Sequence, residues 1–317
     1  MTFRTILPST PSLLRLGHED CILAIGSCFT ENIGAYLEKA KFKIAINPFG
    51  IVYNPISMAD TLFYLLNNKD FEVEKNIFEH QGIWSSFLHH SSFSALTKEG
   101  IIEKIQGELI KSQAFFSKTN RLLITFGSAT VYENKESTQI VANCHKLPAH
   151  TFIKRRLSIE EITATYGRLL TELQANNPSL EIIFTVSPIR HIRDGLVENQ
   201  RSKATLLLAI DALCARFERV HYFPAYELLL DDLRDYRFFE NDLIHPTAFA
   251  TQYIWEYFSE TYFNSTTKEI IEALKKIYMA AAHRPFQPDS AAHQNFLEIH
   301  QENIEIFNAK YPFLIAK

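Results

Sequence analysis

Residues 21–30 of the chain read CILAIGSCFT. The first six, Cys21 to Gly26, form a short apolar run that ends at a glycine turn, and a helix pattern follows over 31–40. A buried strand that turns directly into a helix is the repeating unit of an α/β domain. This stretch therefore predicts the fold class, and much of the remaining chain repeats its pattern.

Two more apolar runs, RLLITFG at 121–127 and EIIFTVS at 181–187, are typical of strands that are buried on both faces of a sheet. Shorter strands are expected at 42–46 and 219–223. Helix-like segments of ten or more residues separate the strands, which indicates right-handed crossovers and a mainly parallel sheet. The expected helices after residue 50 lie at 55–66, 98–118, 159–175, 201–217, 247–263, 267–281 and 290–308.

Two stretches interrupt this alternation. Residues 70–97 are irregular and carry many aromatic and histidine side chains, so we interpret them as an insertion or lid. The segment between 128 and 157 is expected to be a long loop. The main domain is expected to span 1–264 and a helical C-terminal extension to span 265–317. The sequence leaves open whether that extension is a separate subdomain or packs against the domain as a collar.

Composition excludes several classes of protein. The 317 residues suffice for one large α/β domain, and 46% hydrophobic with 21% charged residues is typical of a globular protein. A net charge of −4 gives no reason to expect a nucleic-acid partner. No apolar run approaches the length of a membrane span, and residues 1–8 lack the pattern of a secretory signal, so a cytoplasmic location is expected. The four cysteines form no CxxC pair, which argues against a disulfide scaffold or a zinc site. No metal or other cofactor is expected.

The first candidate for chemistry is the turn Gly26-Ser27-Cys28. In open parallel sheets, ligands bind beyond the carboxyl ends of the strands, and this turn lies at such an end, as does Phe126-Gly127-Ser128. A nucleophile placed here gains from the helix N-terminus, whose free N–H groups and dipole favour negative charge. The competing interpretation is structural: Gly26 turns the chain, Ser27 or Thr30 caps the helix, and Cys28 is a small buried residue.

The second candidate is the segment Asn241–Pro246, which contains Asp242 and His245. A loop with aspartate and histidine three residues apart lets the two side chains lie together. The carboxylate then fixes the imidazole tautomer while the other ring nitrogen faces a nucleophile. The competing interpretation is a helix-capping aspartate and a surface histidine before a proline.

A nucleophile after the first strand and a DxxH pair before a late helix resemble the layout of SGNH/GDSL hydrolases. The chain more closely resembles the GSCFA family, although Thr30 replaces that family's usual alanine. The similar blocks lie over about residues 21–260 and comprise Gly26–Ile33, Asn47-Pro48-Phe49-Gly50, Asn143–Pro148, Ser187–His191 and Asp242–Pro246.

This resemblance implies a three-layer α/β/α, flavodoxin-like fold of the SGNH type. It places Cys28 at the nucleophile position, with Ser27 as the alternative if the alignment shifts by one residue. Asp242 and His245 correspond to the orienting acid and the general base. Gly50 corresponds to the glycine whose N–H helps to bind the oxyanion.

The third block of the superfamily departs from the pattern, because Ala129 stands where an oxyanion-binding asparagine is expected after Gly127. Loss of one such donor costs about 3–4 kcal/mol of transition-state stabilisation. Asn143 and His145, in a polar segment after the same strand, are candidates for a substitute donor. Arg190 follows another strand, where it is expected either to bind an anionic substrate group or to serve the structure.

The resulting hypothesis is an esterase or acyl-transfer enzyme that acts on O-esters of a carbohydrate or small metabolite. The alternative is a non-catalytic ligand-binding or scaffold protein that retains a hydrolase fold, since fold alone does not imply function. The sequence leaves the acyl group, the choice between Cys28 and Ser27, and the oligomeric state undetermined.

Overall fold

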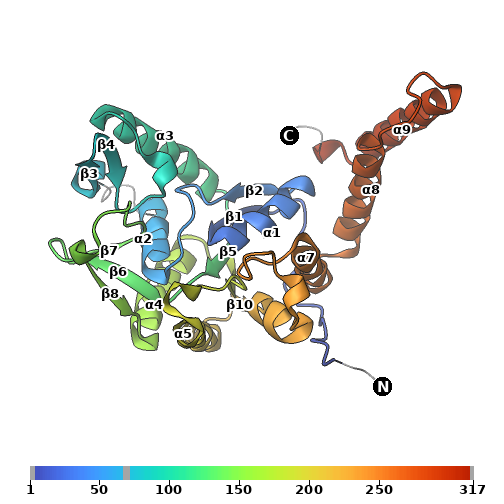
Figure 1. Cartoon of the computed structure of the whole chain (residues 1–317). Coiled ribbons are helices and arrows are strands. Elements are labelled where there is room, and N and C mark those ends of the chain that lie inside the picture. The colour runs from blue at the N-terminus through green and yellow to red at the C-terminus, as the bar shows by residue number, and fades with distance from the viewer. Residues whose placement is uncertain (1–3, 67–71, 315–317) are drawn as a thin grey trace.

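A five-stranded parallel sheet forms the centre of the protein (Figure 1). The computed structural model describes residues 4–66 and 72–314. The strand order is β2-β1-β5-β9-β10, so in chain order the strands run 2-1-3-4-5. This is the flavodoxin-like doubly wound order, and its direction reverses between β1 and β5. The strands are β1 (Cys21–Gly26), β2 (Lys43–Ile46), β5 (Arg121–Phe126), β9 (Glu181–Val186) and β10 (Val220–Phe223).

Helices cover both faces of this sheet, because alternate strand residues point to opposite sides. In β1, Leu23 and Ile25 join one hydrophobic core, whereas Ile22 and Ala24 join a second core. The predicted three-layer α/β/α architecture is confirmed. The first core also contains residues of α2 (Pro55–Leu66), α3 (Lys98–Phe116), α4 (Ile159–Asn176) and α5 (Leu196–Arg216). The second also contains residues of α1 (Cys28–Lys39), α6 (Ala225–Glu227), a π-helical turn over Leu228–Leu233, and α7 (Ala248–Tyr262).

Helix starts follow the capping residues that the sequence offers. Ser158 and Glu161 form the predicted capping box of α4, with each side chain bonded to the other residue's backbone N–H. Asn54 accepts the Ser57 N–H at 2.9 Å and so caps α2 as expected. Two starts were predicted too late. The first helix begins at Cys28 because Ser27 caps it, and α5 begins at Leu196 after Gly195.

The interpretations of 70–97 and 128–157 as irregular segments were wrong, although residues 70 and 71 lie outside the described ranges. The first stretch contains a hairpin of β3 (Ile77–His80) and β4 (Ile83–Ser86), joined by Gln81 and Gly82 with φ of +53° and +77°. Positive φ at both central residues is typical of a two-residue hairpin turn. The second stretch forms an antiparallel sheet of order β7-β6-β8. Its strands are β6 (Thr130–Asn134), β7 (Ile140–Val141) and β8 (Phe152–Arg156).

Two helices at the C-terminal side, α8 (Ser265–Ala281) and α9 (Ala291–Lys310), project from the rest of the molecule (Figure 1). They have a small hydrophobic cluster of their own, formed by Ile270, Leu274, Phe307, Tyr311 and Leu314. We propose a boundary between the main domain and this extension at residue 264. None of the helices in the described ranges combines the length and apolarity needed to cross a membrane.

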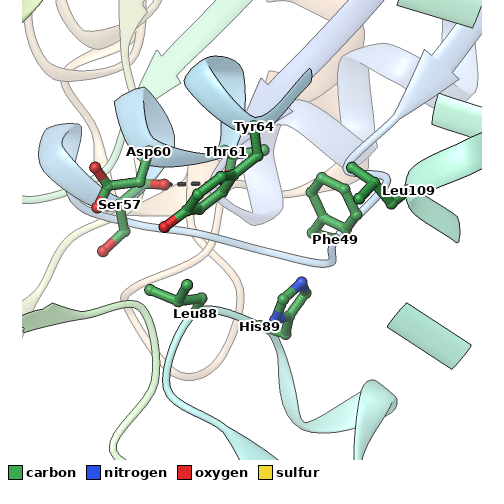
Figure 2. A pocket seen from close by; sticks show the side chains of 8 residues that line it. All are labelled: Phe49, Ser57, Asp60, Thr61, Tyr64, Leu88, His89 and Leu109. Carbon is green, nitrogen blue, oxygen red and sulfur yellow. Dashed lines mark hydrogen bonds between the residues drawn. The ribbon is translucent and has the colours of Figure 1, made fainter. Parts of the chain in front are cut away.

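The segment that follows β4 and helix α2 line a cavity of about 10 Å³ (Figure 2). Leu88 and His89 face Phe49, which precedes α2, and Thr61 with other residues of α2 across this space. The cavity is too small to hold more than about one water molecule. It is therefore a feature of the packing, and not a substrate site.

Asp60 lines this cavity, and burial raises the pKa of its carboxyl to about 6, against a smaller opposing effect of Arg168. A raised carboxyl pKa means that the folded state holds its proton more tightly than the unfolded state does. This contribution to stability is complete below about pH 4 and is lost as the pH rises through 6.

We predict that Asp60→Asn removes this loss. The free energy of unfolding of the variant, relative to that of the wild type, should rise by about 2–3 kcal/mol between pH 4 and pH 8. Urea unfolding at both pH values measures the difference. Glu103→Gln, at an exposed position of α3, is the matched control and should show no such trend. Equal pH trends for the two variants would contradict the prediction.

Candidate active site

The turn after β1 places Ser27 and Cys28 in different environments. Ser27 is 2% exposed, and its Oγ accepts the Phe29 N–H at 3.3 Å as the cap of α1. A side chain at Gly26, where φ is +152°, would collide with the Thr125 carbonyl oxygen, so the turn requires glycine. Asn47 supports the turn by accepting the Gly26 N–H at 2.8 Å. The serine is therefore used as a buried helix cap, while Cys28 follows it at the partly exposed first position of the helix.

The Cys28 thiol contacts a residue that the sequence reasoning missed. Its Sγ lies 3.4 Å from Tyr53 Oη, within hydrogen-bond distance for sulfur. The Tyr53 carbonyl accepts the N–H groups of Gly127 at 2.9 Å and Ser128 at 3.0 Å. Tyr53 is thus fixed to the carboxyl end of β5 while its ring reaches the end of β1. The only signal in the sequence is its position between the Asn47–Gly50 block and the start of α2.

Asp242 and His245 lie together, as the spacing predicted. Asp242 Oδ2 is 2.6 Å from His245 Nδ1, and Oδ1 accepts the N–H groups of Ile244 and His245. Those three hydrogen bonds lower the pKa of Asp242 to about 2, the backbone bond from His245 first. The loop holds Leu243 at a φ of +59°, a conformation that is rare for a leucine. Both side chains are nearly half exposed, so this pair is open to a ligand from solvent.

Arg190 anchors the loop that carries this pair. Its backbone N–H donates to Ile244 O at 3.4 Å, and its guanidinium donates to Leu243 O at 3.3 Å. The guanidinium also lies 4.1 Å from the centre of the Phe239 ring. These are the contacts of a residue that positions the loop. Binding of an anionic substrate group by Arg190 stays a prediction.

Cys28 and the Asp242–His245 pair lie at the same edge of the sheet. Cys28 follows β1, and Arg190, which anchors the histidine loop, follows β9. Only β5 separates these two strands, so their axes are about 10 Å apart. Within residues 4–66 and 72–314, no hydrogen bond joins His245 to Cys28 or Ser27.

The predicted oxyanion-binding residues have partners elsewhere. The Gly50 N–H donates to Asn47 O at 2.7 Å, so this bond would have to open before the group could bind an oxyanion. Asn143 Oδ1 accepts the His145 N–H at 2.9 Å, and His145 Nε2 is 2.7 Å from Ser86 O. These contacts join the segment before Pro148 to the β4 region. The roles of these three residues toward a substrate stay predictions.

A buried lysine, also missed from the sequence, holds the loops of this edge together. Lys203 of α5 is 1% exposed, and its Nζ donates to Gly127 O at 2.7 Å and to Ser187 O at 2.6 Å. It therefore links the residues that follow β5 and β9. Burial lowers the pKa of Lys203 to about 7. The Oγ of the neighbouring Ser202 accepts the Ala129 N–H at 2.7 Å and lies 3.2 Å from Ser128 Oγ.

A larger groove lies elsewhere. It has a volume of about 740 Å³ between α1, α7 and α8, and Tyr36 and Lys39 line its α1 side. At 1.5 Å of rise per residue, Lys39 is about 16 Å along α1 from Cys28. This groove is therefore at the opposite edge of the sheet from the candidate site.

Comparison with known protein families shows to which family this chain belongs. The profile of the GSCFA family matches residues 21–258. The chain belongs to the GSCFA family. A second profile, for the C-terminal domain of GSCFA domain proteins, matches residues 274–315 and so reaches from α8 through α9. The first match contains Ser27, Cys28, Asp242 and His245, so this GSCFA chain carries its whole candidate site within the family region.

A comparison with curated proteins found no match. Among solved structures, one similar protein is an acetyl esterase mutant crystallised with acetate ion. The alignment covers 81% of this GSCFA chain and 98% of the esterase, at 10% identity and a TM-score of 0.34.

We predict that Lys203→Met destabilises the protein by about 2–4 kcal/mol, because two buried carbonyl groups lose their donor. Urea unfolding measures the loss. Lys104→Met is the matched control, since Lys104 also donates to a carbonyl, Ser94 O, but at the surface. A similar small loss for both variants would show that the buried link is not important for stability.

Proposed function

We propose that this GSCFA chain is an SGNH-type hydrolase or acyl transferase that acts on O-esters of a carbohydrate or small metabolite. One observation carries the proposal. A partly exposed thiol at a helix N-terminus and an aspartate–histidine pair lie at the same carboxyl edge of the sheet. This edge is where doubly wound α/β proteins bind their ligands.

Cys28 is the nucleophile in this proposal. The competing residue, Ser27, is buried and already accepts the Phe29 N–H, so its attack on a substrate would break the cap of α1. Cys28 is partly exposed, and as the first residue of α1 it lies where the helix dipole favours a developing negative charge. The geometry therefore supports the cysteine over the serine.

His245 acts as the general base, and Asp242 orients it. The Asp242 carboxylate accepts from His245 Nδ1, which leaves Nε2 as the nitrogen that exchanges protons with the thiol and the leaving group. A movement of the loop or of the two side chains must close the distance between Nε2 and Sγ when substrate binds. Catalytic hydrogen bonds are often loose in empty sites and tighten in the substrate complex.

A non-catalytic, ligand-binding role is the second candidate. Ala129 has no side-chain donor, and the Gly50 N–H is bonded to Asn47 O, so two of the expected oxyanion contacts are missing from this arrangement. This function predicts ligand binding at the same edge without turnover.

We predict that hydrolysis of short-chain p-nitrophenyl esters depends on Cys28 and His245. Cys28→Ala and His245→Ala should each lower kcat by at least about 10³-fold, because the nucleophile and its base act as a unit. Cys214→Ala and His150→Ala are matched controls outside the site and should keep full activity. Ser27→Ala removes the cap of α1, so it should lower the free energy of unfolding by about 1 kcal/mol. Its ester turnover should be retained.

Three results would contradict this proposal. Wild-type protein that hydrolyses no ester would favour the binding role, and activity that survives His245→Ala would exclude the mechanism. Labelling of the wild type by a fluorophosphonate probe at Ser27, with no reaction of iodoacetamide at Cys28, would make the serine the nucleophile.

A further inference from the structure

Few oxyanion donors are available beside Cys28. The Cys28 N–H is at the first position of α1, where helix geometry provides no intrahelical acceptor, so this group can bind an oxyanion. The Gly50 N–H is bonded to Asn47 O. Ala129 is fully buried, carries no polar side chain, and uses its own N–H to bond Ser202 Oγ. The arrangement therefore lacks a side-chain donor at the position where the superfamily has asparagine.

We propose that the Tyr53 hydroxyl is the missing donor and binds the oxyanion that forms when Cys28 attacks an ester carbonyl. This inference rests on the proposed acyl-transfer function. Tyr53 Oη lies 3.4 Å from Cys28 Sγ and is the side-chain hydroxyl that contacts the thiol. The acyl carbon would be bonded to Sγ and its oxygen would lie one bond further. A hydroxyl at this distance can come within the roughly 2.7–3.1 Å that an oxyanion donor requires.

The backbone around Tyr53 fixes this hydroxyl in position. Its carbonyl holds the N–H groups of Gly127 and Ser128, the first two residues of the block that lacks its asparagine. A methyl group built on Gly127 would lie 3.0 Å from Tyr53 O and 3.2 Å from Tyr53 Cδ1. The glycine of the third block thus makes room for the tyrosine. Tyr53 therefore contacts Cys28 from the carboxyl end of β5, where the third block of the superfamily carries its asparagine.

The electrostatic environment keeps Tyr53 a donor. Tyr53 is 47% exposed, and its partial burial, followed by the hydrogen bond with Cys28, raises the pKa of the phenol above its usual range. The hydroxyl therefore retains its proton and offers it as a hydrogen bond across the neutral pH range. A neutral donor can stabilise the oxyanion without transferring a proton to it.

In this mechanism His245 takes the thiol proton, and the sulfur forms a bond to the acyl carbon. The π-electron pair of the carbonyl moves to its oxygen, which the Tyr53 O–H and the Cys28 N–H bind. Re-formation of the C=O bond expels the alcohol oxygen, which takes the proton from His245 and leaves a thioester on Cys28. Water then attacks the thioester with His245 as the base, and the acid and the free thiol are regenerated.

The test is Tyr53→Phe, which keeps the ring that packs near Gly127 and removes only the hydroxyl. We expect kcat for p-nitrophenyl acetate to fall about 10²–10³-fold with KM changed by less than about threefold, because the bond forms only in the transition state. Tyr278→Phe in α8 removes a hydroxyl far from this edge and should leave turnover unchanged.

Alkylation of Cys28 by iodoacetamide separates this role from the alternatives, because that reaction uses the same thiol but forms no oxyanion. We expect Tyr53→Phe to alkylate within about threefold of the wild-type rate while ester turnover falls. An equal loss in both reactions would make Tyr53 a residue that only positions or activates the thiol, and would overturn the inference. If wild-type turnover depends on Cys28 and Tyr53→Phe hydrolyses esters at the wild-type rate, the inference about Tyr53 is wrong while the proposed function still holds. If the wild type hydrolyses no ester, both the inference about Tyr53 and the proposed function are wrong.

Discussion

The parallel pairing of β1, β5 and β9 is the constraint on which the rest of the structure depends. Its register sets Gly26 beside Thr125 and Phe126 beside Val186, so the three strands end at the same edge. The loops that carry Cys28, Tyr53 and the Asp242–His245 pair begin there or are anchored there. Lys203 donates to carbonyl groups of both the β5 and β9 loops, and Arg190 fixes the histidine loop to the end of β9. The site is thus assembled by the sheet, from residues that lie more than two hundred positions apart.

Much of this architecture could be predicted because it follows from local pattern. Apolar runs at 121–127 and 181–187 can be buried on both faces only in a covered parallel sheet, and the capping box at Ser158 marks a helix start by its own chemistry. The adjacency of Asp242 and His245 was also predictable, since a spacing of three residues in a tight loop brings the side chains together. The hairpin at 77–86 escaped prediction because its strands are short and only Gln81-Gly82 marks the turn.

The parts that could not be predicted are contacts between distant segments. Tyr53 meets Cys28 only because its carbonyl is bonded to the loop after β5, which no property of the tyrosine's neighbours in sequence specifies. Lys203 lies within a helix whose sequence gives no sign that its amine would be buried between two carbonyls. Position in the sequence indicates an oxyanion role for the Gly50 N–H, and it leaves Arg190 open between an anionic substrate group and a structural role. Their actual partners depend on how the loops fold back on themselves.

In the proposed mechanism Cys28 forms a covalent bond to the acyl group of a substrate. The most direct measurement mixes the wild-type protein with p-nitrophenyl acetate, quenches with acid during the first turnover, and locates the acetyl group by peptide mass spectrometry. A Cys28 nucleophile predicts one acetyl group on Cys28, held as a thioester that neutral hydroxylamine removes, and its disappearance in Cys28→Ala. An acetyl group on Ser27, or turnover with no acetylated Cys28 at any quench time, would contradict it.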